Sequence, residues 1–213
     1  MKRKSIAIVA GGALDAFLLE RIREAQYIIG VDRGAYWLIT HGVVPDVAIG
    51  DFDSVTKKEF SHIKKNVTKI IRELPHPKYV TDLELAIEYA KTLDPKEVGI
   101  FGAIGSRFDH TFAGITLLLN LSSYNIYGYI VDNFNKIQIV RRVLKLKPSK
   151  VFKYVSLFSL NGKTTVTLTG FRYNVSKRIF LPGSTLGVSN EIAAKQATIT
   201  IHEGLALVMQ SKD

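Results

Sequence analysis

The sequence contains no cysteine among its 213 residues. Disulfide bonds, thiolate metal sites and a cysteine nucleophile are therefore excluded, and any metal ion must bind through oxygen or imidazole ligands. Long apolar runs are lacking as well. The apolar stretch from Phe112 to Leu121 is far shorter than the roughly 20 residues that a membrane-spanning helix needs. The sequence therefore predicts no membrane partner.

The amino-terminal residues have the order of charges and apolar residues that is typical of a secretory signal, with Met1-Lys2-Arg3-Lys4 ahead of an apolar run from Ile6. Gly11, Gly12 and Asp15 interrupt this run early, and no small-x-small cleavage site follows. We interpret the run as an uncleaved first β-strand and expect a cytoplasmic location.

Composition favours a globular chain, because apolar residues make up 46% of it and aromatic residues 10%. The length favours one large domain or two small ones, at about 150 residues per domain. The net charge is +10, from 29 Lys and Arg against 19 Asp and Glu, and such an excess attracts polyanions. The basic residues are scattered instead of forming a stripe interleaved with aromatic side chains, so we do not expect nucleic acid as a partner.

Short β-branched runs alternate with helical spacing from residue 5 to about 135, which predicts an α/β fold with a mostly parallel sheet and flanking helices. The expected strands are Ser5–Ala10, Tyr27–Val31, Val47–Ile49, Val67–Ile71, Val98–Phe101 and Ile126–Val131. The clearest helix start is Thr81-Asp82-Leu83-Glu84, which has the form of a capping box. A second helix is expected from about Asp109 to Leu121.

Beyond residue 136 the pattern changes to alternating strands, as in Lys163–Thr169 and Ala197–Ile201. This pattern predicts a carboxyl-terminal antiparallel β domain. We place the first domain at residues 1–140 and the second at 141–213, with the basic segment Arg141–Lys153 as the connection between them.

Aspartates follow successive predicted strands. Asp32 follows the second strand, Asp51 and Asp53 the third, Asp82 the fourth and Asp109 the fifth. Each one alone is well explained as a helix cap or a turn residue. Their repetition favours function, because the loops at the carboxyl ends of parallel strands face one crevice.

Several carboxylates in one crevice repel one another and raise each other's pKa unless a cation lies among them. Magnesium takes oxygen ligands and commonly binds one or two carboxylates together with substrate phosphates. The sequence therefore predicts a magnesium–nucleotide site. In Asp51-Phe52-Asp53, an extended backbone would put both carboxylates on one side, with Phe52 turned into the core.

Two loops are candidates for the phosphate side. Gly11 and Gly12 follow the first strand and would leave backbone N–H groups free to approach an anion. The stretch from Gly102 to His110 follows a strand, opens a helix and places Arg107 beside Asp109. We interpret His110 as a helix-start residue rather than a general base.

Taken in order, these motifs resemble the thiamine pyrophosphokinase family over nearly the whole chain. The stretches that carry the resemblance are Val31–Ser54, Thr81–Glu84, Gly105–His110, Thr169–Asn174 and Gly187–Glu191. The resemblance implies that the carboxyl-terminal domain is a β-sandwich that binds thiamine, and that the protein is a homodimer with thiamine near the subunit interface. It also implies transfer of a pyrophosphoryl group from ATP to the thiamine hydroxyl, giving thiamine diphosphate and AMP.

The resemblance further implies roles for individual residues. Catalysis and Mg²⁺ binding would fall to Asp51, Asp53, Asp82 and Asp109. The nucleotide would contact Gly11, Gly12, Asp32, Arg33, Ser54, Lys78, Thr81 and Arg107. Thiamine would contact Thr167, Tyr173, Ser189 and Asn190, with Tyr173 stacked on its rings. The logic is that of phosphoryl transfer in general, where cations neutralise charge and loops align the reacting groups.

Two positions depart from the family pattern. Arg33-Gly34 stands where the family usually has two glycines, which adds a side chain beside the expected phosphates. Ahead of Thr81 the family usually has another acidic residue, whereas this chain has Lys78 and Tyr79. One metal ligand is therefore missing from the pattern, and the number of metal ions is left open.

Two other functions fit parts of the sequence. The string Ala48–Ser54 resembles the strand and Asp-x-Asp loop of magnesium-dependent phosphatases with an aspartyl nucleophile, although that family has the motif on its first strand. The net charge would also suit a non-catalytic basic binding module. A covalent phosphate on Asp51 would support the former, and salt-sensitive binding of nucleic acid the latter.

Overall fold

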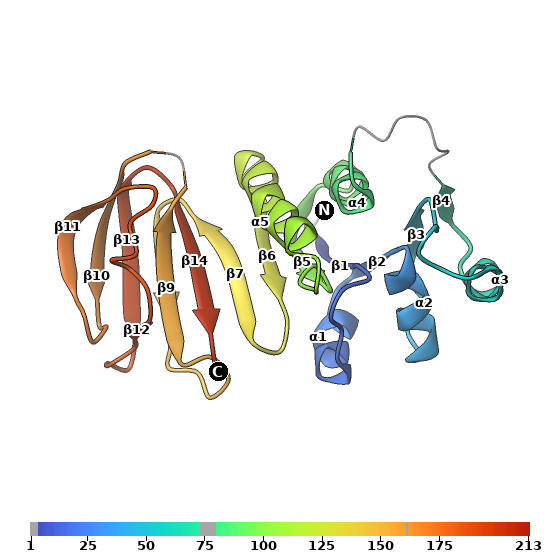
Figure 1. The fold of residues 1–213 in the computed structure, drawn as a ribbon, viewed down its shortest axis with the longest axis horizontal. Helices are drawn as coiled ribbons and strands as arrows, with labels where there is room; N and C mark the ends of the chain where they lie inside the picture. The colour runs from blue at the N-terminus through green and yellow to red at the C-terminus, as the bar shows by residue number, and fades with distance from the viewer. Residues whose placement is uncertain (1–3, 73–79, 161) are drawn as a thin grey trace. The chain divides into compact units, whose positions relative to one another are not determined.

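The computed structural model describes residues 4–72, 80–160 and 162–213. The chain divides into two compact units, one up to Asn133 and the other from Phe134 to Asp213 (Figure 1). The division falls ahead of the predicted boundary at residue 140 because β7 (Asn135–Val140) pairs with β14 (Ala206–Ser211) of the second unit.

The first unit is built on a parallel sheet in which the strands lie in the order β6, β5, β1, β2, β3, β4. Their bounds are β1 (Lys4–Val9), β2 (Tyr27–Val31), β3 (Val47–Gly50), β4 (Ile70–Arg72), β5 (Pro95–Phe101) and β6 (Tyr127–Val131). The central strands are buried on both faces, as parallel strands between helices must be, and Ile8 and Ile100 pair in register with no exposed area. The predicted α/β class is confirmed.

Helices connect these strands. They are η1 (Ala16–Leu18), α1 (Leu19–Arg23), α2 (Arg33–Thr40), α3 (Lys57–Asn66), α4 (Asp82–Thr92) and α5 (Phe108–Ser123). Thr81 caps α4 as predicted, because its hydroxyl accepts a hydrogen bond from the N–H of Glu84 at 3.2 Å. The reciprocal capping box forms at Thr56 and Glu59 of α3, a helix start that the sequence reading did not single out.

The second unit consists of two antiparallel sheets packed face to face. One contains β12, β9, β14 and β7 in that order, and the other contains β11, β10, β13 and β8. The remaining bounds are β8 (Val143–Leu146), β9 (Tyr154–Ser159), β10 (Thr164–Thr169), β11 (Val175–Phe180), β12 (Asn190–Glu191) and β13 (Ala197–Glu203). The segment Arg141–Lys153 was expected to be only a connection, but β8 lies within it and pairs with β13.

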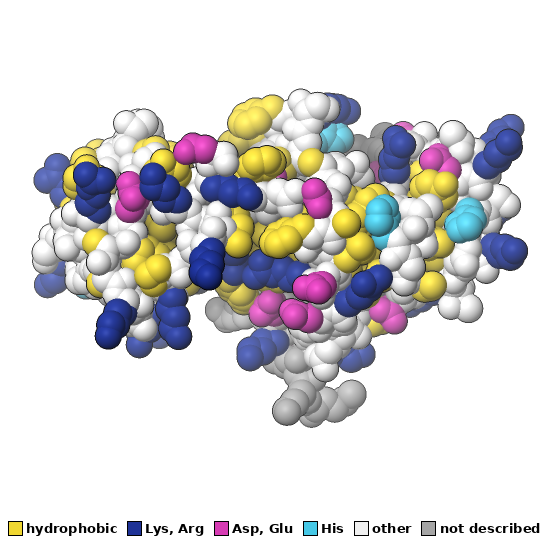
Figure 2. All heavy atoms as spheres, turned by 90° about the horizontal axis from the view of Figure 1, so that it is seen from below, with side chains coloured by type: hydrophobic (Ala, Val, Ile, Leu, Met, Phe, Trp, Pro, Cys, Tyr) yellow, Lys and Arg dark blue, Asp and Glu magenta, His cyan; other side chains and the backbone are white. Residues whose placement is uncertain are grey.

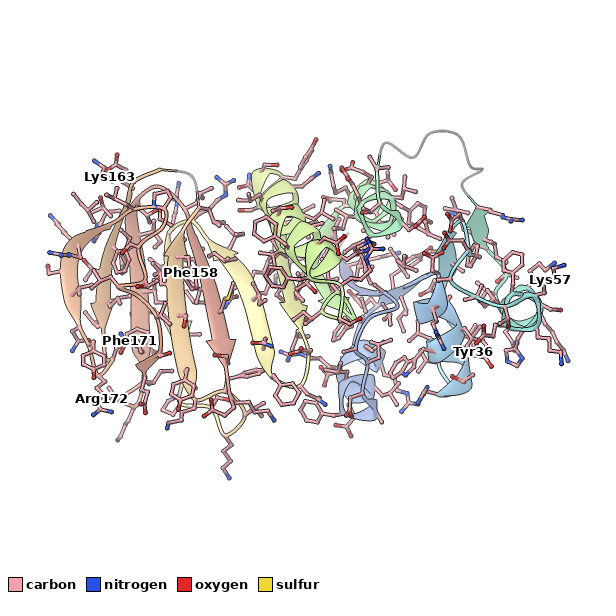
Figure 3. All side chains as sticks on the ribbon, viewed as in Figure 1. Tyr36, Lys57, Phe158, Lys163, Phe171 and Arg172 are labelled. Carbon is pink, nitrogen blue, oxygen red and sulfur yellow. The ribbon has the colours of Figure 1, made fainter. Side chains whose placement is uncertain are left out.

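Alternating apolar residues fill the space between these two sheets. Val166 and Leu168 from one sheet share a core with Val155 and Leu157 from the other. Phe171 closes this core near the end of β10, and the next residue, Arg172, lies at the surface (Figure 3). The predicted β-sandwich is therefore confirmed. In the described part of the chain, no helix is both long enough and apolar enough to cross a membrane.

Candidate active site

A cavity of about 580 Å³ lies in the first unit, where the loops at the carboxyl ends of the parallel strands come together. Most of the residues predicted to bind nucleotide line it. They are Gly11, Gly12, Asp32, Arg33, Ser54, Thr81 and Arg107. Asp53 and Asp82 line it as well, together with residues to which the sequence assigned no role, including Thr111, Ala113 and Gly114. Lys78 and Tyr79 lie outside the described residues.

Three carboxylates gather at this edge of the sheet. Each of Asp32, Asp51 and Asp82 offers an oxygen within 4.8 Å of the other two. Asp51 and Asp82 were predicted to bind metal, whereas Asp32 was assigned to the nucleotide. Asp32 follows a strand as the others do, so the signal that would have placed it among the ligands was present. Oxygen ligands at this spacing fit a hard divalent cation such as Mg²⁺.

The close approach of Asp32 depends on backbone geometry that only particular residues tolerate. Asp32 has a positive φ of 47°, and its carboxylate accepts a hydrogen bond from the N–H of Phe52 at 3.0 Å. At Gly50, where φ is 143°, a Cβ atom would lie 2.0 Å from Oδ1 of Asp32. Glycine at this position therefore leaves the space that the carboxylate occupies.

Among these carboxylates, Asp32 has a pKa that burial and the neighbouring charges raise strongly. Burial, followed by the charge of Asp82, raises the pKa of Asp32 to about 7 from its ordinary value of 3.8, and Asp51 and Asp53 add to the effect. The hydrogen bond from Phe52 acts in the opposite direction. A cation among these carboxylates would relieve the repulsion, so the residues fit the ion that the sequence analysis predicted.

Phe52 anchors the loop that carries Asp51 and Asp53. Its side chain is buried as expected and packs against Phe60 with the ring centroids 4.8 Å apart. The backbone at Phe52 is left-handed, with φ of 61°, and not extended. The N–H of Asp53 consequently donates to Oδ1 of Asp51 at 2.9 Å. Asp51 joins the carboxylate cluster, whereas Asp53 faces the cavity.

The glycine loop after β1 differs in one respect from its expected role. The N–H of Gly12 donates to the carbonyl of Gly102 at 2.8 Å, so this donor is not free to meet an anion. A Cβ at Gly12 would lie 2.4 Å from the same carbonyl oxygen. Gly12 therefore allows the loops after β1 and β5 to touch, which shapes the wall of the cavity.

Arg107, the residue before α5, and Asp109, in its first turn, form an ion pair with Nη2 and Oδ2 2.6 Å apart and both side chains largely exposed. The hydrogen bond from Arg107 holds the pKa of Asp109 below its ordinary value. Asp109 is outside the cluster of three carboxylates. His110 lines the cavity, and Thr111 fixes the loop by accepting the N–H of Gly105 at 3.2 Å.

The residues predicted to contact thiamine all lie in the second unit. The ring of Tyr173 is exposed, as a stacking surface must be. Asn190 is buried, and its amide accepts from the N–H of Tyr173 at 3.0 Å and donates to the carbonyl of Tyr173 at 2.8 Å, so it holds the Tyr173 loop. Ser189 is exposed. Thr167 shares a hydrogen bond of 2.8 Å with Nε2 of His202.

The fold and the site together define a class: an α/β enzyme with an acidic crevice beside a cavity large enough for a nucleotide. Two family models match the chain, namely thiamin pyrophosphokinase, catalytic domain, over residues 18–130 and thiamin pyrophosphokinase, vitamin B1 binding domain, over residues 141–206. The chain belongs to the thiamin pyrophosphokinase family, and the prediction that it is an enzyme of this kind is confirmed.

Similar proteins agree with this placement. Thiamine pyrophosphokinase of Bacillus subtilis is 33% identical over 99% of this chain and 100% of its own length. A crystal structure of the Bacillus subtilis protein superposes with a TM-score of 0.91, covering 99% of this chain and 100% of that one. A thiamin pyrophosphokinase structure from Geobacillus thermodenitrificans has a TM-score of 0.86 at 29% identity, covering 98% of each chain.

Proposed function

We propose that this protein transfers a pyrophosphoryl group from ATP to the hydroxyl of thiamine, giving thiamine diphosphate and AMP, in the presence of Mg²⁺. The observation that carries the proposal is the cluster of Asp32, Asp51 and Asp82, of which Asp32 and Asp82 line the cavity, within the unit that matches the catalytic-domain model. Cavities of this size hold ligands as large as nucleotides.

In this reaction the thiamine hydroxyl oxygen bonds to the β-phosphorus of ATP. The bond from that phosphorus to the oxygen bridging the α- and β-phosphates breaks, AMP leaves with that oxygen, and the hydroxyl proton is released. Bound Mg²⁺ would supply charge neutralisation on the phosphate oxygens. The chain itself aligns the two substrates, and no protein nucleophile is required.

Each group of residues has a role in this proposal. Asp32, Asp51 and Asp82 hold the cation, and Asp53 and Asp109 stay predicted ligands. Arg107 and Arg33 face the phosphates as cations, and Arg107 offers a planar fork that suits phosphate oxygens. The nucleotide residues Gly11, Gly12, Ser54, Lys78 and Thr81 stay as predicted.

We propose that thiamine binds to the second unit through Tyr173, Thr167, Ser189 and Asn190. The exposed ring of Tyr173 supports stacking on thiamine, and Asn190 acts by holding the Tyr173 loop. A homodimer with thiamine near the subunit interface and a cytoplasmic location complete the proposal. Nucleic acid is not part of the proposal, because the basic residues are scattered along the sequence. On the face in Figure 2, Asp and Glu side chains are also present beside the Lys and Arg side chains.

A product assay tests the reaction. Purified protein is incubated with ATP, with Mg²⁺ or EDTA, and with or without thiamine, and nucleotides and thiamine esters are separated by chromatography. We expect AMP and thiamine diphosphate in equal amounts only when thiamine and Mg²⁺ are both present. Stoichiometric ADP would contradict pyrophosphoryl transfer, and a phosphorylated Asp51 would favour the phosphatase reading.

A further inference from the structure

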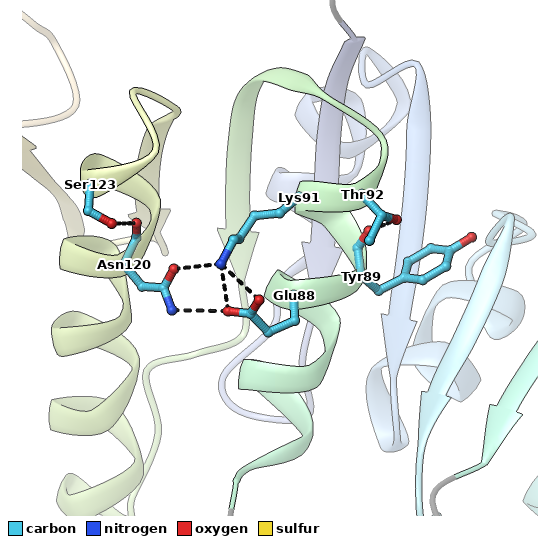
Figure 4. Close-up of polar contacts among 6 residues, drawn as sticks. All are labelled: Glu88, Tyr89, Lys91, Thr92, Asn120 and Ser123. Carbon is cyan, nitrogen blue, oxygen red and sulfur yellow. Dashed lines mark hydrogen bonds and ion pairs between the residues drawn. The ribbon is translucent and has the colours of Figure 1, made fainter.

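A polar network ties α4 to α5 far from the cavity. Nζ of Lys91 lies 2.8 Å from both carboxylate oxygens of Glu88 on its own helix and 3.1 Å from Oδ1 of Asn120 on α5. The amide nitrogen of Asn120 donates back to Oε1 of Glu88 at 3.0 Å. The three side chains thus form a closed ring of hydrogen bonds between the two helices (Figure 4).

Within this network Lys91 is largely buried, whereas the side chain of Glu88 is about half exposed, at 49%. The side chain of Lys91 is only 11% exposed, and its ammonium group lies 3.7 Å from the centre of the Tyr124 ring. A lysine that gives up this much hydration needs several partners, and here a carboxylate, an amide oxygen and an aromatic face supply them. Such a group has few other positions available, so it fixes the spacing of the helices that hold its partners.

Both helices carry active-site residues at their other ends. Thr81 and Asp82 begin α4, and Arg107 and His110 begin α5. At a rise of about 1.5 Å per residue, Lys91 lies about 14 Å along α4 from Asp82. Near the cavity, Leu83 of α4 contacts α5 at Gly114, because a Cβ atom at Gly114 would be 3.5 Å from Cδ2 of Leu83. The helix pair therefore includes a contact beside the cavity and another at the far end.

Two contacts that are far apart along two helices fix the angle between them, whereas a single contact allows one helix to rotate relative to the other. We propose that Glu88, Lys91 and Asn120 form a positioning clamp that sets the angle between α4 and α5, and so holds Asp82 at the distance from Asp32 and Asp51 that cation binding requires. Ala86, Ile87 and Ala90 of α4 are buried and keep this helix on the sheet. Without the clamp, we expect the far end of α4 to shift relative to α5 and Asp82 to move away from Asp32 and Asp51. This inference rests on the proposed function only in taking the three carboxylates as the cation site.

The test compares Lys91→Met and Asn120→Leu with Thr92→Val. Thr92 is adjacent to Lys91, but its hydroxyl donates only to the carbonyl of Tyr89 within α4 (Figure 4), so this variant removes a hydrogen bond without touching α5. The first readout is the rise in the melting midpoint with added Mg²⁺, which needs no substrate. The second is the Mg²⁺ concentration for half-maximal AMP formation.

We expect the two clamp variants to need on the order of tenfold more Mg²⁺ in both readouts, at the lower end of the loss found for residues that support metal ligands directly, while Thr92→Val behaves as wild type. If the clamp variants melt at a lower temperature but keep the wild-type Mg²⁺ dependence, the network is merely structural and the proposal is wrong. A wild-type protein stabilised by Mg²⁺ but unable to form AMP would instead contradict the proposed function.

Discussion

At the scale of single residues, Asp32 links the stability of the protein to pH. Its pKa is raised to about 7 by burial and by the neighbouring Asp82. A raised carboxyl pKa means that the folded state binds the proton more tightly than the unfolded chain. Stability from this group is therefore fully present below pH 3.8, the ordinary pKa, and is lost as the pH rises through about 7.

The substitution Asp32→Asn should remove the loss of folding stability that accompanies the rise in pH. Asn keeps an oxygen that accepts the N–H of Phe52 but carries no charge. We expect the variant to gain stability over wild type by about 2 kcal/mol between pH 5 and pH 8, a value below the full pKa effect because solvent screens part of the repulsion. Urea unfolding at both pH values without divalent cations measures it. If the stability of the two proteins depends on pH in the same way, Asp32 is not the group whose raised pKa lowers the stability of the wild-type protein.

Substitutions of Asp82 and of Asp109 should affect the kinetics of the enzyme in different ways. Asp82 belongs to the carboxylate cluster, whereas Asp109 holds Arg107 at 2.6 Å. We expect Asp82→Asn to lower kcat by about 100-fold or more and to raise the Mg²⁺ requirement. Asp109→Asn should in addition raise KM for ATP by about tenfold, because Arg107 loses its orientation. A Mg²⁺ requirement left unchanged by Asp109→Asn would remove Asp109 from the proposed ligands.

At the scale of elements, the turn after β3 decides whether the cluster can form. Gly50→Ala should place a methyl group against Asp32, in addition to straining the backbone. Gly42→Ala is the matched control, because Gly42 also has a positive φ, of 71°, but its Cβ would meet only the end of Arg23 at 3.9 Å. We expect each variant to lose about 1–2 kcal/mol through strain.

Only Gly50→Ala should also lose binding of Mg²⁺. Chemical denaturation with and without Mg²⁺ separates the two effects, because stabilisation by the ion depends on the carboxylates and not on the strain. If both variants keep the wild-type stabilisation by Mg²⁺, the space at Gly50 is not what positions Asp32.

Elements were predictable where periodicity carries the signal. The long α5 and the buried β2 and β5 follow from apolar patterns that local sequence determines. The short β8 was not predicted because four residues within a basic segment are too few to show an alternation of apolar and polar side chains. The capping box of α3 could have been predicted from Thr56 and Glu59, but the apolar side of the helix that follows consists of only Phe60, Ile63 and Val67 among charged residues.

The site was predictable in outline and not in detail. That several aspartates meet at one edge follows from parallel topology alone. Which of them come together depends on the left-handed backbone at Asp32 and Phe52, and residue order does not reveal such turns when the residue is not glycine. The same turns bring Asp32 into the cluster and turn Asp53 toward the cavity.

At the scale of the whole molecule, the surface of the first unit includes an aromatic pair that a single copy leaves uncovered. Phe108 and Phe112 on α5 are 74% and 58% exposed, and their rings stack with centroids 6.5 Å apart. Two adjacent exposed rings cost free energy in water, and a second subunit is a common way to bury them. The proposed homodimer supplies such an occupant.

Phe112→Ser should therefore weaken self-association. Removing one ring from a buried aromatic pair typically costs an interface about 2 kcal/mol or more, which is a rise of at least about 30-fold in the dimer dissociation constant. Val44→Ser is the control, because Val44 is equally exposed at 58% but follows α2 and lies apart from this pair in the sequence. Sedimentation at several protein concentrations measures the change in the dissociation constant.

The KM for thiamine should change together with the association of the subunits, because thiamine is proposed to bind near the interface. It should rise in Phe112→Ser at concentrations where the variant dissociates, and it should recover as the protein concentration is increased. A variant that stays dimeric like wild type would place the subunit interface elsewhere on the molecule.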